Sequence, residues 1–446
     1  MTTPMFDEER MAKDVREFSF PRLVGSPGEL RARQTCLERL REAGLQPVEE
    51  EFAFSTFFAR FWVRGSMALL AALLVLYSVR DLAEVLAVAF RWYGFVLFAY
   101  YSIVLLVFRD PTHFRPRNRR SANILAKLPP KGDPAGIVVV SAHYDSKSQR
   151  LTIFWRAFLA IFVVALGVPT TALIVAREAL ASEGHPAAGP LLVAVRILVV
   201  PLTCAQITLA INKIGNKSPG AADDASGMAC VFELARHYAK NPLQHHEVWF
   251  VLFGAEELGT MGSRFFLLRH LRELRPRRAV RPSKKDPRRG SWNSFNVNFD
   301  TIFDSVKIIK ERKIFRKYVY ARLADAYREA CRELGYPVET FYLGPGASTD
   351  RKNFDKAHVE VLDVCDWTGS RVAHSPRDVP ENVKPHLLRQ ACEVVHGVLE
   401  RIDAGRLRPK HPYWSRVINR APRNASVVAS PASKRAWRTL PPSCGC

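Results

Sequence analysis

Four long apolar segments restrict the fold of this chain more than any other feature of its sequence. They lie at residues 65–79, 92–108, 157–175 and 190–211, and Arg196 is the only charged residue within them. Each approaches the roughly 20 residues that a helix needs to cross a bilayer. Arg196 lies near one end of its segment, where a long side chain can reach the lipid headgroups. We expect about four transmembrane helices; buried core helices of a soluble domain are the alternative.

The four segments pair into two hairpins, 65–108 and 157–211, so both hairpins leave and return on the same side of the membrane. Few basic residues mark the two tips, which carry Arg80 and Arg177, with Arg91 just inside a helix. The return side is rich in Lys and Arg, at Arg60, Arg64, Arg109, Arg115, Arg117, Arg119, Arg120, Lys147, Arg150, Arg156, Lys213 and Lys217. By the positive-inside rule, we expect an integral membrane protein whose remaining sequence faces the cytoplasm.

The cysteines and the net charge agree with this placement. The eight cysteines have no disulfide-framework spacing, which is typical of a reducing compartment; they are Cys36, Cys204, Cys230, Cys331, Cys365, Cys392, Cys444 and Cys446. The formal net charge is +22, and the stretch 275–290 is strongly basic. This stretch has no interleaved aromatic residues for base stacking, so we expect membrane lipid and not nucleic acid as the partner. A solvated loop is the alternative.

Outside the apolar segments, predicted helices alternate with predicted strands. Helical periodicity is expected at 28–45, 225–240, 263–274, 317–336 and 383–402, and strands at 48–54, 123–129, 136–146, 247–259, 294–303 and 358–367. This alternation predicts an α/β fold, a three-layer α/β/α sandwich with a mostly parallel mixed sheet. Such sheets carry their functional sites just past the carboxyl ends of the strands.

Polar residues lie at the carboxyl ends of several predicted strands. The predicted strand ends and the loops beside them hold His143, Asp145, Asp223, Asp224, Glu256, Glu257, Asp300, His374 and Asp378. Taken singly, each could be a helix cap, loop charge or solvated side chain. Together they combine nitrogen and oxygen ligands without thiolates, which suits zinc or a similar divalent ion. Two metals bridged by one carboxylate need about five protein ligands, and that number is available.

Five motifs make the pattern specific: HYD, GAADDASG, FGAEELGTMGS, NFD and AHSPRDVPEN. In this order they resemble the co-catalytic zinc aminopeptidases, a family with bacterial leucyl aminopeptidases, glutamate carboxypeptidases and, by fold, glutaminyl cyclases. The stretch PRLVGSPGELRARQTCLERLREAGLQPVEEEF also resembles the family's first helix and strand. The resemblance covers residues 17–56, about 121–148 and 214–402.

The resemblance implies two zinc ions per chain. His143 and Asp300 would hold one ion, Glu257 and His374 the other, and Asp223 would bridge them.

The resemblance also implies roles for three further acids. Asp145 would orient His143, and Asp350 lies in a loop that in the family often lines the substrate pocket. Glu256 would be the general base that takes a proton from a metal-bridging water and returns it to the leaving amine.

Two positions depart from the family pattern. Ala373 replaces the aromatic residue that often precedes the last His, and Arg351 replaces a His that often follows the acid of the GASTD loop. Both departures affect expected specificity and rate, but neither removes a metal ligand. Because all five ligands are kept, a non-catalytic scaffold of the same fold is the weaker alternative.

The resulting expectation is a membrane-anchored zinc-dependent exopeptidase, most specifically an aminopeptidase acting on peptides. A glutaminyl cyclase-like zinc transferase is the alternative enzyme, and a carboxypeptidase would need Arg or Lys to bind the substrate carboxylate. The second hairpin interrupts the loop between His143 and Asp223, which would hold the site close to the membrane surface. The expected organisation is an N-terminal part of the catalytic domain at 1–60, a transmembrane hairpin at 61–108, catalytic domain at 109–150, a second transmembrane hairpin at 151–212, catalytic domain at 213–406, and a disordered basic tail at 407–446.

Overall fold

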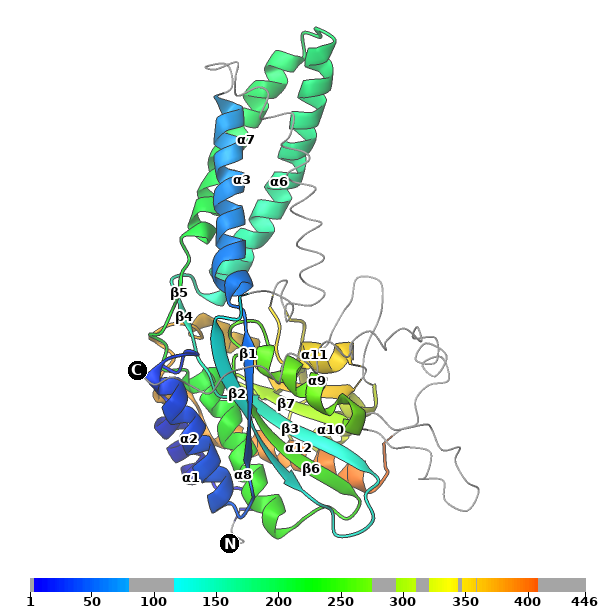
Figure 1. Cartoon of the computed structure of the whole chain (residues 1–446). Helices are drawn as coiled ribbons and strands as arrows, with labels where there is room; N and C mark the ends of the chain where they lie inside the picture. Colours follow the sequence, from blue (N-terminus) through cyan, green and yellow to red (C-terminus); the bar gives the residue numbers. More distant parts are fainter. Residues whose placement is uncertain are drawn as a thin grey trace.

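The computed structural model describes residues 4–79, 116–274, 294–309, 321–343, 347–357 and 359–407. Three long helices rise from one edge of an α/β domain (Figure 1). The apolar segment 92–108, the basic stretch 275–290 and the tail beyond residue 407 lie outside the described residues.

A mixed sheet forms the centre of the α/β domain, with eight strands in the described part of the chain. Its order is β1-β2-β6-β3-β7-β10-β8-β9. The strands are β1 (Val48–Phe54), β2 (Arg119–Leu128), β3 (Gly136–His143), β6 (His246–Phe253), β7 (Phe295–Asp300), β8 (Lys307–Ile309), β9 (Glu339–Phe341) and β10 (Glu360–Cys365). The neighbours β6, β3, β7 and β10 run parallel, whereas β1, β2 and β6 pair antiparallel. The predicted mostly parallel mixed sheet is confirmed.

Helices cover both faces of the sheet. One face carries α1 (Glu8–Phe18), α2 (Pro27–Glu42), α8 (Ser226–Lys240), α10 (Ala321–Leu334) and α12 (Pro385–Asp403), and the other carries α9 (Met261–Leu274) and α11 (Arg351–Lys356). Val138 and Val140 of β3 pack on the first face, while Ile137 and Val139 pack on the second. Burial on both faces explains why this strand is a continuous apolar run without alternation.

Helix α1 was not among the predicted helices. Its N-cap is Asp7, whose carboxylate accepts hydrogen bonds from the main-chain N–H groups of Glu9 and Arg10. Met11 and Val15 lie four residues apart on its buried side. The cap and this short apolar stripe are the signals that mark the helix in the sequence.

Three described helices are long and apolar enough to cross a membrane, judged by length and composition. They span Ala59–Ser78, which contains α3 (Val63–Ser78), together with α6 (Ile153–Ser182) and α7 (Ala188–Ala210). Helix α7 packs against both α3 and α6. These three helices contain the predicted apolar segments 65–79, 157–175 and 190–211 almost completely, and the fourth predicted segment lies outside the described residues. A two-stranded ladder, β4 (Ser148–Gln149) with β5 (Ile214–Gly215), closes the base of the α6–α7 hairpin.

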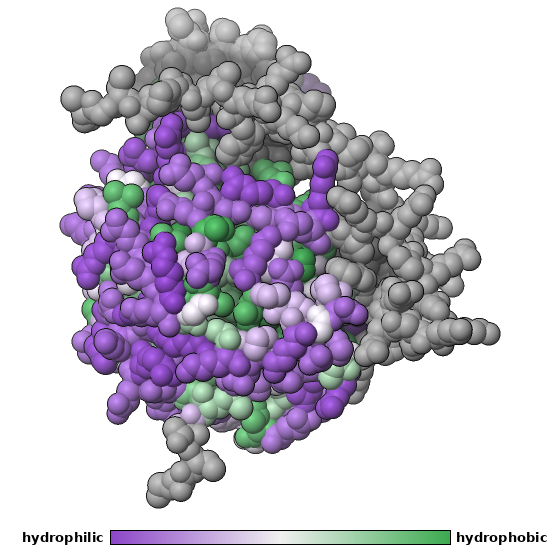
Figure 2. All heavy atoms as spheres, turned by 60° about the horizontal axis from the view of Figure 1, so that its bottom comes forward, coloured by the Kyte–Doolittle hydropathy of each residue, from purple (hydrophilic) through white to green (hydrophobic). Residues whose placement is uncertain are grey.

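The arginines of this bundle lie at its ends. Arg196 Nε donates to the carbonyl of Ser78, the last residue of α3, at 2.9 Å, and Arg64 Nε donates to the carbonyl of Ala210 at 2.7 Å. Each bond satisfies a carbonyl that a helix end leaves without an intrahelical partner. The opposite face of the α/β domain, away from the bundle, is largely hydrophilic (Figure 2). The described part of the molecule therefore has one hydrophilic end and one apolar end.

Candidate active site

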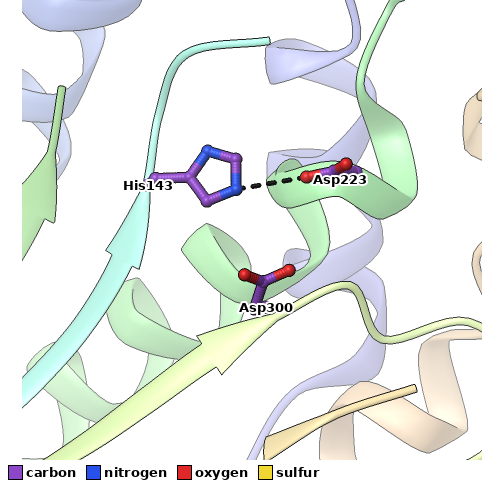
Figure 3. A group of neighbouring side chains, drawn as sticks. All are labelled: His143, Asp223 and Asp300. Carbon is purple, nitrogen blue, oxygen red and sulfur yellow. Dashed lines mark ion pairs between the residues drawn. The ribbon is translucent and has the colours of Figure 1, made fainter. Parts of the chain in front are cut away.

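Two neighbouring parallel strands deliver the first ligands. His143 ends β3 and Asp300 ends β7, while Asp223 comes from a short helical turn, Ala221–Ala225, that leads into α8. Nε2 of His143 lies 3.1 Å from Oδ1 of Asp223, and Asp300 lies beside this pair (Figure 3). The ligand atoms of the three residues all lie within 4.8 Å of one another. This is the first group that could hold a metal ion.

The second group shares Asp223 with the first. Nε2 of His374 lies 3.3 Å from Oδ2 of Asp223 and 3.0 Å from Oε2 of Glu257. These three ligand atoms also lie within 4.8 Å of one another. Asp223 therefore turns one oxygen toward each group.

The donor atoms fit divalent cations at both places. Nδ1 of His143 lies 3.1 Å from the carbonyl of Asp145, which can only accept, so Nδ1 donates there and Nε2 is the ring nitrogen that faces the group. Within the described part of the chain, Oε1 of buried Glu257 has no hydrogen-bond partner. Buried imidazole and carboxylate groups that converge without thiolates are the ligands expected of catalytic zinc.

Comparisons with known proteins agree with this geometry. Residues 206–399 match the family model of peptidase family M28. Aminopeptidase YwaD of Bacillus subtilis (strain 168) is 27% identical over 199 residues, which cover 43% of this chain and 40% of that protein. This segment therefore resembles peptidase family M28. The predicted resemblance is confirmed, and the chain spans about 40% of the length of this curated relative.

Solved structures match this chain at low sequence identity, and one of them reaches a TM-score that indicates a shared fold. The glutaminyl cyclase of Porphyromonas gingivalis matches with a TM-score of 0.50 and 13% identity, over 90% of this chain and all of that one. An aminopeptidase from Aneurinibacillus sp. strain AM-1 matches with a TM-score of 0.49 and 15% identity, over 89% of this chain and 94% of that one.

Two further acids hold Asp223, the residue that both candidate ligand groups share, in place. The carboxylate of Asp378 accepts hydrogen bonds from the main-chain N–H groups of Ala222, at 2.6 Å, and Asp223, at 3.2 Å. Asp224 accepts from the N–H groups of three other segments, those of His143, Gly227 and Thr301. Asp224 therefore ties the ends of β3 and β7 to the start of α8.

Asp145 acts through two different groups. Its carbonyl is the nearer partner of His143 Nδ1, since its Oδ1 lies 3.7 Å from that nitrogen. Its carboxylate accepts from the main-chain N–H groups of Glu256, at 3.0 Å, and Glu257, at 3.2 Å. The predicted orienting of His143 thus runs mainly through the backbone, and the side chain fixes the turn after β6.

The buried charges shift one another's pKa. Burial raises the pKa of Asp223, but the hydrogen bonds from His143 and His374 outweigh it and hold that pKa well below its usual range. Burial also opposes the charge on Glu257, but His374 and Lys147 lower its pKa to about 2. Burial and the nearby charges of Asp350, Glu257 and Asp300 raise the pKa of Glu256 well above the ordinary value, against the opposing effect of His143. The adjacent acids Glu256 and Glu257 therefore have pKa values shifted in opposite directions.

Sequence reasoning missed two basic residues that contact the site. Nζ of Lys147 lies 2.6 Å from Oε2 of Glu257 and donates to the carbonyl of that residue. Arg22 is completely buried and donates to the carbonyls of Tyr144 and Gly220, beside the HYD and GAADDASG motifs. It also donates to the carbonyls of Phe18, Phe20 and Pro219, and because all these partners are main-chain oxygens, no sequence motif marks it.

The residues that depart from the family pattern have defined surroundings. Asp350 is only 1% exposed and burial raises its pKa to about 7, while its neighbours Ser348 and Thr349 line the cavity over the site. A direct substrate contact by Asp350 stays a prediction. Arg351 is buried and donates to the carbonyl of Ile309, which joins α11 to β8. Ala373 lines the cavity beside His374.

Proposed function

We propose that this chain is a membrane-anchored, zinc-dependent aminopeptidase whose catalytic domain faces the cytoplasm. The observation that carries the proposal is Asp223, whose two oxygens face two separate groups of buried ligands. The M28 domain and the aminopeptidase relative support peptide hydrolysis as the reaction.

Each ligand has a place in this proposal. His143 and Asp300 would hold one zinc ion, Glu257 and His374 would hold the other, and Asp223 would be shared between them. When bound, zinc polarises a carbonyl group and lowers the pKa of water toward neutrality. The protein contributes the fixed positions of the five side chains through the main-chain bonds described above.

Glu256 is the proposed general base. It belongs to neither ligand group, yet it lines the same cavity as His143 and Asp223. A carboxylate with a raised pKa can accept a proton from the attacking water and return it to the leaving amine. The amide C–N bond then breaks, which releases a carboxylate and an amine.

The acids around the cavity could recognise a free amine. Glu256 and Asp300 both line the cavity and could face a substrate ammonium group. Among the described residues, basic side chains line it as well, those of Arg64, Lys147, Arg156, Arg264, Lys352 and Lys356. Lys147 pairs with Glu257, and Arg156 donates a hydrogen bond to the side chain of Gln149. We prefer an aminopeptidase to a carboxypeptidase because the curated relative is an aminopeptidase.

A direct experiment tests the proposal. The purified full-length protein is incubated with a mixed peptide panel, and released N-terminal amino acids are measured with and without a chelator. We expect release that the chelator abolishes and zinc restores. The variant Glu256→Gln should retain zinc but lose about 10²–10⁴-fold in kcat. Undiminished release by this variant would overturn the assignment of the base, and zinc-loaded protein without any release would overturn the proposed reaction.

The structural match to a glutaminyl cyclase supports a second candidate at the level of fold. A cyclase would convert an N-terminal glutaminyl residue to a ring and release ammonia, whereas a peptidase releases the amino acid. Assaying ammonia and free amino acid together on glutaminyl peptides separates the two reactions, and a chelator-sensitive release of ammonia alone would favour the cyclase.

A further inference from the structure

The cavity over the candidate active site continues between the apolar helices. Its volume is about 1170 Å³, and Glu256 and His374 line its inner end. Its other end is lined by α3, α6 and α7, and we call this part the slot. The slot residues are Val63, Arg64, Met67, Leu70 and Leu74 of α3, Leu202, Gln206 and Leu209 of α7, and Ile153, Arg156, Ala157, Ala160, Val163, Val164, Gly167, Val168, Thr171, Ala172, Val175 and Ala176 of α6.

The slot follows one face of α6 over most of its length. The lining residues of this helix recur every three or four positions from Ile153 to Ala176, so they form a single stripe. At 1.5 Å per residue, the stripe is roughly 35 Å long, close to the thickness of a bilayer core. The lining residues of α3 recur at the same spacing from Val63 to Leu74.

Small residues keep the slot open on the α6 side. Ala157, Ala160, Ala172 and Ala176 line it, and a Cβ added at Gly167 would meet no atom within 4 Å. The cavity also exceeds the roughly 300–1,000 Å³ of typical small-molecule pockets. The available space is therefore larger than the side chain of one substrate residue requires.

The chemistry of the slot wall suits a hydrocarbon chain. Among the described residues, the side chains that line the slot beyond Arg64 and Arg156 at its mouth are apolar except for Thr171 and Gln206, and the Thr171 hydroxyl already donates to the carbonyl of Gly167. An extended peptide would leave its N–H and C=O groups without partners here, at several kcal/mol each. A hydrocarbon chain has no such groups, and each buried methylene contributes about 0.8 kcal/mol relative to water.

We propose that the substrate is an amino acid joined by an amide bond to a long hydrocarbon chain, and that the slot holds this chain. The inference rests on the proposed function, because it assumes hydrolysis beside Glu256. Glu256 and Asp300, the acids that would face the free amine, lie at the sheet edge, while the slot leads away along the helices. The chain therefore lies on the amine side of the bond. Water adds to the carbonyl carbon, the C–N bond breaks, and the long-chain amine leaves with a proton returned by Glu256.

A series of leucyl alkylamides tests this proposal, with ethyl, hexyl, dodecyl and hexadecyl chains. Full-length protein in lipid nanodiscs is compared with Ala160→Trp and Gly167→Trp, which fill the slot at two depths. Ala165→Trp is the matched control, because Ala165 is exposed on α6 and does not line the cavity. In the unaltered protein, kcat/KM should rise with chain length.

The depth of each substitution should set the chain length at which activity falls. We expect Ala160→Trp to lower the ratio of hexadecylamide to ethylamide kcat/KM at least tenfold. Gly167 lies about 10 Å farther along α6, so the fall with Gly167→Trp should begin at a longer chain. Ala165→Trp should leave the ratio unchanged.

Four results would overturn the proposal. These are a flat chain-length profile in the unaltered protein, an equal loss for all chains in the slot variants, the same loss in Ala165→Trp, and cleavage of N-hexadecanoyl-leucine in preference to the alkylamides. An equal loss would mean that lipid or another part of the protein fills the slot. Cleavage of the ethylamide with a flat chain-length profile would refute only the proposal that the slot binds a hydrocarbon chain. No cleavage of any leucyl amide by zinc-loaded protein would refute the proposed function itself.

Discussion

The main-chain N–H of Gln149 donates to the carbonyl of His374 at 2.9 Å. Gln149 belongs to β4, the strand that closes the base of the α6–α7 hairpin, and its side chain accepts a hydrogen bond from Arg156 at the start of α6. His374 has a positive φ of 62°, so its backbone adopts a conformation that needs support from its surroundings. The apolar hairpin therefore helps to position a proposed zinc ligand.

Gln149→Pro tests this link, because proline removes the N–H that His374 accepts while Gln149→Ala keeps it. We expect the proline variant to lose about 10–100-fold in zinc affinity or activity, as is typical when the support of a metal ligand is removed. The alanine variant should lose much less. Zinc titration followed by peptidase assay measures both effects, and similar losses in the two variants would place the effect in the side chain.

The shared carboxylate predicts a specific pattern of zinc loss. His374→Ala removes a ligand of one group only, so the purified variant should hold about one zinc ion per chain. Asp223→Ala removes a ligand of both groups, and it should hold close to none. Metal content measured by mass spectrometry, with the unaltered protein expected at two ions, checks the pattern. A full complement of zinc in Asp223→Ala would rule out the bridge.

The sequence predicts where the candidate ligands lie because they follow recognisable strands. His143 ends the continuous apolar run of β3, and Asp300 ends β7, in which apolar residues alternate with Asn296 and Asn298. The sheet brings these strand ends together at one edge. The orienting groups are harder to predict. Asp378 supports Asp223 from 155 residues away through main-chain N–H groups, and Arg22 bonds to carbonyls that every residue possesses. Contacts with the backbone leave no residue-specific pattern in a single sequence.

The slot could not be predicted for a related reason. Each apolar segment shows only that its helix is apolar, and a stripe of small residues on α6 looks like ordinary helix packing. Its meaning depends on where α3 and α7 lie, and on the fact that the stripe begins beside Glu257 and His374. The hairpin sequences contain no information about that placement until the α/β domain fixes their bases.

Helix α1 should depend on Glu233, the buried acid of α8 to which it is tied. Glu233 accepts from the N–H of Asp7 at 3.0 Å and from Nε of Arg10 at 2.8 Å. Glu233→Gln replaces one acceptor with a donor that faces these donors, so we expect a loss of about 2 kcal/mol in the free energy of unfolding. Thermal unfolding should show a Tm lower by about 5 °C, whereas Glu38→Gln, on the exposed side of α2, should change it little.

The contribution of Glu233 to the free energy of unfolding should depend on pH in a direction that can be predicted. Burial raises the pKa of Glu233, but Arg10 and the N–H of Asp7 outweigh it, so the pKa is lowered in the folded protein. The stabilisation is therefore complete above the unfolded pKa of about 4.3 and is lost as the pH falls through the lower folded value. The stability difference between unaltered protein and Glu233→Gln should be constant from neutral pH to about 5 and should shrink below 4. A difference that grows on acidification would contradict the assignment.

The proposed sidedness of the apolar helices predicts which thiols an impermeant reagent can reach. Native Cys331 and Cys392 cannot report it, because both are completely buried. We therefore place cysteines at two exposed positions, Ser182→Cys at the end of α6 and Asn241→Cys just after α8, in a background without Cys204, Cys444 and Cys446.

The basic side chains at the base of the bundle favour a cytoplasmic α/β domain. On intact cells, a membrane-impermeant maleimide should label Ser182→Cys, whereas Asn241→Cys should react only after lysis. The reverse pattern would place the α/β domain outside the cytoplasm. Labelling of both positions on intact cells would mean that the helices do not separate them across a membrane, and the slot would then open to water instead of lipid.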